Sequence, residues 1–389
     1  MNKKLLITSN TSWFIFNFFV PTIKEMIREG YVVHLLTPSD KYTDRLVEVG
    51  CIHHQLDINP SGGNPVQEIR TIIRIFRVIK ALNPYCVLNF TPKLNVYSGF
   101  CCRLIKVPVV NSVAGLGSIF LEDNFKAKVG KLLLKASQNR VDHVIFQNPD
   151  DLQIYLKEGY TQEDRISLVG GIGVDLKKFV PHQAKDDNTV RFILVARLLR
   201  SKGVGEFVEA AIEVDKYMSS LESRRDVETQ AKRAEFYLLG FVDESNPQAI
   251  SRETIETWHT NTAVNYLGQT DDVFSVVKEM DCVVLPSYYR EGMPQCLIEA
   301  AAMAKPIITT DNVGCREIVV NNESGFIVKP KCVDDLKLAM IKMIEMTHQQ
   351  RLELGKVGRR KAENEYCHLK ISKHYIEVIE SIANRKSSI

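Results

Sequence analysis

The sequence predicts an α/β protein of two domains, each built on a parallel β-sheet covered by helices. Its 389 residues are enough for two separate hydrophobic cores. Short apolar runs alternate with longer segments of helical periodicity, which is typical of doubly wound parallel sheets. This alternation stops at the polar, proline-containing stretch 177–190 and then starts again. We therefore expect a linker there, with domains at 1–180 and 181–370.

The first domain is expected to contain five short strands rich in Leu, Val and Ile. These strands lie at 4–9, 32–38, 85–90, 107–113 and 143–148. Apolar residues at helical spacing predict helices at 20–31, 42–51 and 65–84. Pro65 suits the first turn of the last of these helices, and Asn83-Pro84 suits its end.

The second domain is expected to repeat the pattern with six strands and intervening helices. The strands lie at 191–198, 235–241, 263–269, 282–287, 306–311 and 325–330. The charged segment 217–235 predicts the solvated end of one helix, and 371–382 predicts a final helix near the C-terminus.

Charge is distributed unevenly along the chain, although the formal net charge of +3 gives no nucleic-acid signature. Residues 1–180 hold 22 Lys and Arg against 16 Asp and Glu, whereas the remainder holds 28 against 31. The basic first half favours an anionic surface or ligand on that side, and a chance distribution is the equal alternative.

The nine cysteines form neither a disulfide framework nor a metal site. They include no C-x-x-C motif and no Cys/His zinc spacing, so reduced thiols in a cytosol are expected. The opening "MNKKLLITSN" is interrupted too soon for a signal peptide, and no apolar run approaches the roughly 18 residues of a spanning helix. Residues 1–29 contain no glycine, which counts against a dinucleotide-binding dehydrogenase.

The stretch "YYREGMPQCLIEAAAMAKPIITTD" (288–311) sets two carboxylates in mostly apolar surroundings. A buried carboxylate is costly without a partner, so Glu291 and Glu299 each need a ligand or a counter-charge. A predicted strand precedes the stretch, and Pro294 suits the first position of a helix. Ligands of doubly wound folds bind beyond the carboxyl ends of the strands, so we expect both glutamates at a cleft between the domains. The alternative is a glutamate that caps a neighbouring loop.

The block "EGMPQCLIEAAAMAKPIITTDNVGCREIV" (291–319) resembles the donor-binding signature of retaining glycosyltransferases with the GT-B fold, in the large family 4 of group 1 glycosyl transferases. The resemblance implies two Rossmann-like domains and a C-terminal segment, 371–389, that crosses back to the first domain. It implies that Glu299 binds the ribose hydroxyls of a nucleotide-sugar and that Glu291 contacts the sugar ring. The loop residues of the same implied donor site are Gly292, Met293 and Pro294.

The segment "LVARLLRSKGVGEFVEAA" (194–211) resembles the diphosphate-binding block of the same family. Arg197 and Lys202 follow a predicted strand, and two cations suit a leaving nucleoside diphosphate because it gains negative charge as the glycosidic bond breaks. The alternative is a pair of solvated surface cations, and Ala196 stands where the family often has Gly. The resemblance implies that side chains neutralise the diphosphate, so neither a cofactor nor an obligatory metal is expected.

The segment "LGQTDD" (267–272) resembles the part of the family that holds the nucleobase through backbone groups. Asp271 and Asp272 are expected to cap a helix first and to contact the base second. No D-x-D motif follows a predicted strand, which agrees with the expectation that no metal is required.

The segments "NFTPKLNVYSGF" and "VAGLG" resemble bacterial glycosyltransferases that build O-antigen, capsule or glycoprotein glycans on a polyprenyl diphosphate. Lys93 is a natural partner for an acceptor phosphate, and glycines permit close approach of the backbone to a ligand. A glycine-containing turn with a surface lysine is the alternative. Many family members place a His near 111–114, where this chain has none, so the role of that His is in doubt. The residues expected at the acceptor or in the cleft are Asn10, Thr11, Lys93, Asn95, Gly115 and Gly117.

The segment "FKAKVGKLLLKASQNR" (125–140) interleaves basic and apolar residues. Its cations are Lys126, Lys128, Lys131, Lys135 and Arg140. An amphipathic helix of this kind suits the surface of an anionic membrane, and an ordinary surface helix with a core-facing stripe is the equal alternative. A lipid-linked acceptor and the basic first half favour the membrane.

The resemblance covers nearly the whole chain and predicts a retaining hexosyltransferase that uses a UDP-sugar, either a UDP-N-acetylhexosamine or UDP-galactose. It would form an α-linkage to a polyprenyl-diphosphate-linked sugar, in the cytoplasm at the inner face of a bacterial plasma membrane. Glu291, Arg197 and Lys202 are the expected catalytic residues, and no side chain stands out as a nucleophile. A UDP-N-acetylglucosamine 2-epimerase of the same fold and a non-catalytic nucleotide-sugar-binding subunit remain as alternatives.

Overall fold

The computed structural model describes residues 3–59, 64–116, 125–139, 141–222, 232–244 and 246–387. The chain divides into two compact units, and each contains one parallel sheet, which confirms the predicted α/β class. The first unit comprises Met1–Gly173 and Tyr366–Ile389, and the second comprises Val174–Glu365. The division after Gly173 comes a few residues before the polar stretch where the sequence predicts a linker.

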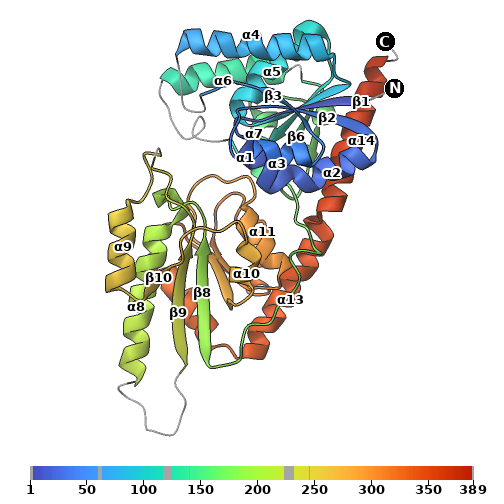
Figure 1. Ribbon diagram of the computed structural model, residues 1–389. Helices are drawn as coiled ribbons and strands as arrows, with labels where there is room; N and C mark the ends of the chain where they lie inside the picture. Colours follow the sequence, from blue (N-terminus) through green and yellow to red (C-terminus); the bar gives the residue numbers. More distant parts are fainter. Residues whose placement is uncertain are drawn as a thin grey trace. The chain divides into compact units, whose positions relative to one another are not determined.

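The first unit holds a seven-stranded parallel sheet in the order β3-β2-β1-β4-β5-β6-β7. Figure 1 labels β1, β2, β3 and β6 of this sheet. Its strands are β1 (Lys3–Thr8), β2 (Tyr31–Thr37), β3 (Ile52–Gln55), β4 (Cys86–Phe90), β5 (Val109–Val113), β6 (His143–Phe146) and β7 (Ile166–Leu168). The strand order reverses between β1 and β4, because the chain proceeds outward on opposite sides of this pair. Such a reversal is where ligands of doubly wound sheets bind.

Helices cover both faces of this sheet. One face carries α1 (Ser12–Phe14), the π-helix η1 (Ile15–Phe19), α2 (Val20–Arg28), α3 (Thr43–Glu48) and α14 (His368–Ser387). The other carries α4 (Pro65–Leu82), α5 (Pro92–Ile105), α6 (Phe125–Gln138) and α7 (Pro149–Lys157). Successive residues of a strand point to opposite faces, so Leu5 and Ile7 of β1 pack with the first group and Leu6 with the second.

The second unit holds a six-stranded parallel sheet in the order β10-β9-β8-β11-β12-β13. Its strands are β8 (Thr189–Val195), β9 (Arg233–Leu239), β10 (Val264–Tyr266), β11 (Cys282–Leu285), β12 (Ile307–Thr310) and β13 (Gly325–Val328). Its helices are α8 (Val204–Glu222), α9 (Arg252–Asn261), α10 (Val273–Val277), α11 (Gln295–Ala302), α12 (Val333–Glu345) and α13 (His348–Glu365). The strand order here reverses between β8 and β11, as it does between β1 and β4 in the first unit.

The C-terminal helix α14 completes the core of the first unit. Tyr375 is fully buried, its ring lies edge-on to Phe19 with centroids 5.4 Å apart, and its hydroxyl is 2.8 Å from Ser112 Oγ. Near the end of the same helix, Lys3 Nζ and Tyr85 Oη donate hydrogen bonds to Glu380, at 2.6 Å and 3.0 Å. Residues about 370 positions apart in the chain therefore fold together in one unit.

The structure differs from the sequence-based expectation mainly at the edges of the first sheet. Its two edge strands, β3 and β7, were not expected, because β3 reads Ile-His-His-Gln without an apolar run and β7 has only three residues. The predicted solvated helix end at 217–235 is found in α8 up to Glu222, and residues 223–231 lie outside the described part. Its last residues, Arg233–Glu235, belong to the strand β9 instead. Within the residues that are described, no helix is both long enough and apolar enough to cross a bilayer.

Candidate functional site

The loops that follow β8 and β11 meet at the strand reversal of the second unit. Ser201, in the loop after β8, offers its carbonyl oxygen to the backbone N–H groups of Tyr288 and Tyr289, at 3.0 Å and 3.1 Å. The Ser287 hydroxyl oxygen lies 3.2 Å from the same oxygen. These bonds fix one loop against the other, so the side chains that both loops carry are held at one place.

Gly203 makes this close contact possible. Its φ of +75° lies in the left-handed region, and a Cβ there would lie 2.2 Å from the carbonyl oxygen of Pro286. Gly314 has a comparable role next to Gly292, because a Cβ at its φ of +83° would lie 2.2 Å from the carbonyl oxygen of Gly292. Both glycines let the backbone pack around the loop that carries Glu291.

Lys202 and Glu291 form a buried ion pair at this junction. The Lys202 ammonium donates to Glu291 Oε1, and the Ser287 hydroxyl donates to the same oxygen at 2.9 Å. The side chains of Lys202 and Glu291 are only 14% and 11% exposed. The partner of the first glutamate is therefore a cation 89 positions earlier in the sequence, and two predicted site residues are brought together.

Arg197 stands apart from this pair and is more accessible. Its guanidinium contacts Asp243 Oδ2 at 3.3 Å, and its side chain is 43% exposed. The pKa of the Tyr289 hydroxyl is raised, first by burial and then by the charge of Glu291. The positive charges of Lys202 and Arg197 oppose this increase. Lys202 Nζ also lies 5.9 Å from the centroid of the Tyr289 ring. Sequence reasoning did not single out Tyr289, although it lies two residues before Glu291.

Glu299 lies in the middle of α11, one element further along the chain. Burial raises the pKa of its carboxyl to about 7, against the opposing effects of a hydrogen bond from Gln295 and the positive charge of Lys178. Pro294 has an extended ψ of 116° and is the N-cap of α11, so the helix begins one residue later than the sequence predicts. The carboxyl of Glu299 is thus held on a rigid helix in surroundings that favour its neutral form.

The other predicted donor residues lie around this junction or at the edge of the same unit. Gly292 and Pro294 are buried and Met293 is half-buried in the loop before α11. Asp272, not Asp271, is the N-cap of α10, and its carboxylate accepts a hydrogen bond from the Ser275 backbone N–H at 3.3 Å. Asp271 is exposed beside it.

In the first unit, the residues after β1 begin the next helix. Thr11 caps α1 by accepting a hydrogen bond from the Phe14 backbone N–H at 3.2 Å, and Asn10 is half-buried in the preceding turn. A buried row of polar side chains, which sequence reasoning missed, crosses the sheet nearby. The Thr8 hydroxyl donates to Asn89 Oδ1 at 2.7 Å, and Asn89 Nδ2 donates to Asn111 Oδ1 at 2.8 Å. Polar residues inside otherwise apolar strands were the available signal.

Lys93 is held by an ion pair inside the first unit. Its ammonium contacts Glu68 Oε1 at 2.7 Å and donates to the Asn59 carbonyl at 2.8 Å. Tyr97 donates to the other oxygen of Glu68 at 2.8 Å. The charge that the sequence assigns to an acceptor phosphate is thus already balanced by a carboxylate.

Asn95 and Gly115 line a cavity of about 240 Å³ at the carboxyl ends of β4 and β5. Asn95 is 3% exposed and donates from Nδ2 to the Ser112 carbonyl at 3.1 Å. Thr91, which also lines the cavity, has a φ of +74°, an unusual conformation for a β-branched residue. Gly115 also has a positive φ, of +107°, whereas Gly117 lies outside the described residues.

Within the described ranges, no three His, Cys, Asp or Glu side chains gather as they would around a metal ion. A buried lysine, an accessible arginine and a helix-borne carboxyl surround the strand reversal where an anionic, hydroxyl-rich ligand is expected to bind.

Two family models match this chain. Residues 4–148 match the model described as "Glycosyl transferase 4-like", and residues 176–361 match "Glycosyl transferases group 1". The chain belongs to the group 1 glycosyltransferases. The resemblance expected from the sequence is thereby confirmed, and the enzyme is a hexosyltransferase.

Two curated relatives give this class more detail. The chain is 28% identical to the N,N'-diacetylbacillosaminyl-diphospho-undecaprenol alpha-1,3-N-acetylgalactosaminyltransferase of Campylobacter jejuni, over 95% of this chain and 96% of that protein. It is 26% identical to the UDP-Gal:alpha-D-GlcNAc-diphosphoundecaprenol alpha-1,3-galactosyltransferase of Escherichia coli, over 72% of this chain and 71% of that protein.

Solved structures confirm the GT-B fold. Anabaena HepE, solved in complex with UDP and glucose, aligns with a TM-score of 0.76 at 14% identity, over 98% of this chain and 100% of that one. A glycosyltransferase from Rickettsia africae aligns with a TM-score of 0.74 at 17% identity, over 98% of both chains. At these identities the likeness concerns the fold alone.

Proposed function

We propose that this glycosyltransferase transfers a sugar, an N-acetylhexosamine or galactose, from a UDP-sugar to a sugar linked to a polyprenyl diphosphate. The named activities of the Campylobacter and Escherichia coli relatives support the acceptor class, and the second name supports a UDP-sugar donor. The observation that carries the proposal is the buried Lys202–Glu291 pair at the strand reversal of the second unit.

Each residue of the second unit has a distinct role in this proposal. Lys202 and Arg197 stabilise the negative charge that develops on the departing UDP. Among the described residues, each of the two cations contacts one carboxylate. Glu291 orients the transferred sugar, and its bond to Lys202 couples the sugar to the diphosphate. Glu299 accepts hydrogen bonds from the ribose hydroxyls, which favour its ionised form.

We further propose the retaining stereochemical course that the family resemblance implies. The acceptor hydroxyl attacks the anomeric carbon on the face that UDP leaves, its proton passes to the departing phosphate oxygen, and an α-linkage forms with retention. We assign no side chain as a nucleophile. Because Lys202 and Arg197 supply the charge that a metal would otherwise supply, the reaction is proposed to need no metal.

The first unit is proposed to bind the acceptor. Asn95 and Gly115 line its cavity at the carboxyl ends of the strands, near the turn that contains Asn10 and Thr11 in the same unit. A lipid-linked acceptor resides in a membrane, so the enzyme would work at the inner face of a bacterial plasma membrane, attached at its surface. The exposed basic and apolar residues of α6, such as Leu132 at 68% exposure, support that attachment.

A transfer assay with EDTA tests the proposal. The acceptor is a polyprenyl-diphosphate-linked N-acetylhexosamine in detergent, and the donors are a panel of UDP-sugars. The expected result is a disaccharide from one donor, detected by mass and shown to be α-linked by the anomeric NMR signal. A β-linked product would overturn retention, and a product formed only with added Mg²⁺ would overturn metal independence. Epimerised UDP-sugar without transfer would favour the 2-epimerase alternative.

A further inference from the structure

Helix α4 carries apolar residues on two faces, of which only one packs on the sheet. Ile75, Val78 and Ile79 are buried in the core of the first unit. On the outer face, Val66, Ile69 and Ile73 are 58%, 57% and 44% exposed. Their spacing of three and four residues places them in one stripe along the helix. A helix that only covered a core would have polar residues at those positions.

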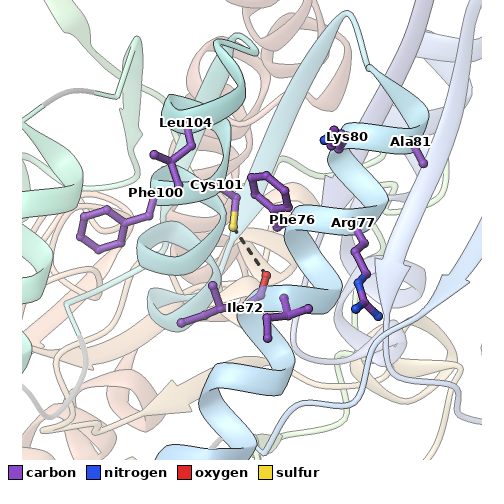
Figure 2. Close-up of a pocket in the computed structure, with 9 residues that line it drawn as sticks. Ile72, Phe76, Arg77, Lys80, Ala81, Phe100, Cys101 and Leu104 are labelled. Atoms are coloured by element: carbon purple, nitrogen blue, oxygen red, sulfur yellow. Dashed lines mark hydrogen bonds between the residues drawn. The ribbon is translucent and has the colours of Figure 1, made fainter.

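This stripe leads into an open apolar groove between α4 and α5. The groove encloses about 480 Å³, and Figure 2 shows Phe76, Phe100 and Leu104 among the side chains around it. Leu104 is 76% exposed, the largest exposed fraction among the large apolar residues described. The Cys101 thiol lies 3.7 Å from the Ile72 carbonyl oxygen and joins the two helices beside the groove (Figure 2).

Positive charge predominates in the segment that forms the groove. Between residues 65 and 116 the cations are Arg70, Arg74, Arg77, Lys80, Lys93, Arg103 and Lys106. The same segment contains a single acid, Glu68, which Lys93 already neutralises. Arg77 and Lys80 line the groove itself, and neither has an ion-pair partner among the described residues. Apolar walls with a cationic rim are complementary to an anionic lipid with its hydrocarbon chain.

The groove lies away from the substrate end of the sheet. α5 leaves the carboxyl end of β4 at Pro92, and Phe100 lies eight residues, or about 12 Å, further along the helix. α4 runs the other way and ends near the start of β4, so residues 76–81 also lie toward the amino ends of the strands. The acceptor sugar and its diphosphate bind at the opposite end, so the groove fits a separate partner.

We propose that the outer face of α4 and α5 docks on an anionic phospholipid bilayer, with an acyl chain in the groove and the phosphate of its headgroup at Arg77 and Lys80. This inference rests on the proposed function, which brings the enzyme to a membrane through a lipid-linked acceptor. It extends the membrane contact from α6, where the sequence predicts it, to two neighbouring helices.

Sedimentation with vesicles tests the docking. Vesicles of phosphatidylcholine with about 30 mol % phosphatidylglycerol are expected to bind the full-length enzyme, and pure phosphatidylcholine vesicles much less. Arg77→Gln/Lys80→Gln should lower partitioning about 30-fold, because each cation near an anionic surface contributes about fivefold. Lys216→Gln/Lys337→Gln, in the second unit, is the control and should change it little. Equal binding to both vesicle types, or an unchanged double variant, would overturn the proposal.

Fluorescence quenching tests the hydrocarbon contact. Leu104→Trp places an indole at the exposed mouth of the groove, and Leu338→Trp, at a 62% exposed site in the second unit, is the matched control. Acyl chains brominated near the headgroup should quench the first indole and spare the second. Quenching of neither would overturn the proposal, as would binding only to vesicles that contain the polyprenyl-diphosphate acceptor. Transfer to a water-soluble short-chain acceptor should be unchanged in Arg77→Gln/Lys80→Gln, so a failure of docking is distinguishable from a failure of the proposed function.

Discussion

At the scale of single residues, the energetic cost of burying a carboxylate is offset in different ways at Glu291 and Glu299. Glu291 is compensated by Lys202 and Ser287, which together satisfy one of its oxygens. Glu299 has no cation in direct contact among its described partners, and burial raises the pKa of its carboxyl to about 7. One carboxylate is therefore held in place by a cation and a hydroxyl. The raised pKa of the other leaves it ready to ionise when a hydroxyl-rich ligand binds.

The Lys202–Glu291 pair is expected to couple stability to catalysis. Lys202→Met removes the cation that contacts the Glu291 carboxylate and should lower the free energy of unfolding by about 3–5 kcal/mol. Lys202→Met/Glu291→Gln removes both charges and should recover most of that loss. Transfer should fall at least about 100-fold in both variants, because the departing UDP loses one of its two cations. Urea denaturation and initial transfer rates check this. A double variant as unstable as the single one would contradict the pairing.

Glu299 should make stability depend on pH. The folded carboxyl keeps its proton up to about pH 7, whereas the ordinary value is 4.5. Between pH 4.5 and about pH 7 the folded state thus binds more protons than the unfolded state. The free energy of unfolding therefore falls as the pH rises through this range. Glu299→Gln should therefore be more stable than the wild type at pH 8, by about 3 kcal/mol, and similar to it at pH 4.

Urea denaturation at the two pH values measures that difference, with the exposed Glu256→Gln as control. The same variant should bind UDP more weakly, because a carboxamide cannot accept two hydrogen bonds from the ribose hydroxyls. An identical stability difference at pH 4 and pH 8 would show that the carboxyl is not the group that titrates.

At the scale of elements, most of the fold was readable from the sequence. Buried parallel strands such as β1 and β11 are continuous apolar runs, so periodicity and turn residues place them to within two residues. The edge strand β3 lacked that signal. The site was readable only in part, since a motif identifies Lys202 and Glu291 separately but not the bond between residues 89 positions apart. The ion pair of Lys93 with Glu68 was equally invisible for the same reason.

The contact between the loops after β8 and β11 should depend on Gly203. Gly203→Ala brings a Cβ to within 2.2 Å of the Pro286 carbonyl oxygen at a φ that L-residues rarely adopt. It should lower the free energy of unfolding by about 2 kcal/mol or more and weaken UDP binding. Gly205→Ala is the matched control, because nothing lies within 4 Å of its Cβ position and Ala favours a helix. Thermal denaturation of both variants checks the difference, and equal melting temperatures would contradict the packing argument.

At the scale of the whole molecule, the chain returns to its first unit after completing the second. α14 supplies Ile371, Tyr375, Val378, Ile379 and Ile382 to a core whose other buried members lie between Leu5 and Ile172. The first unit therefore cannot complete its core until the C-terminus has been synthesised.

Tyr375→Ala should destabilise the first unit selectively. The ring is fully buried against Phe19, so its loss should cost about 3–5 kcal/mol. Leu369→Ala, at a 45% exposed site on the same helix, is the control. Hydrogen exchange should show lost protection in β1 and β4 with β8 and β11 unchanged. Protection lost equally in both units would contradict the assignment of α14 to the first unit alone.

We expect the strand reversal of the second unit to bind the UDP moiety through its own cations. Calorimetric titration of UDP in EDTA, with the wild type and Lys202→Met, measures this binding. The wild type should bind without metal, and the affinity of the variant should be at least about tenfold lower, as expected for the loss of a charged hydrogen bond. Circular dichroism confirms that the variant is folded. Equal affinities, or wild-type binding only when Mg²⁺ is added, would contradict it.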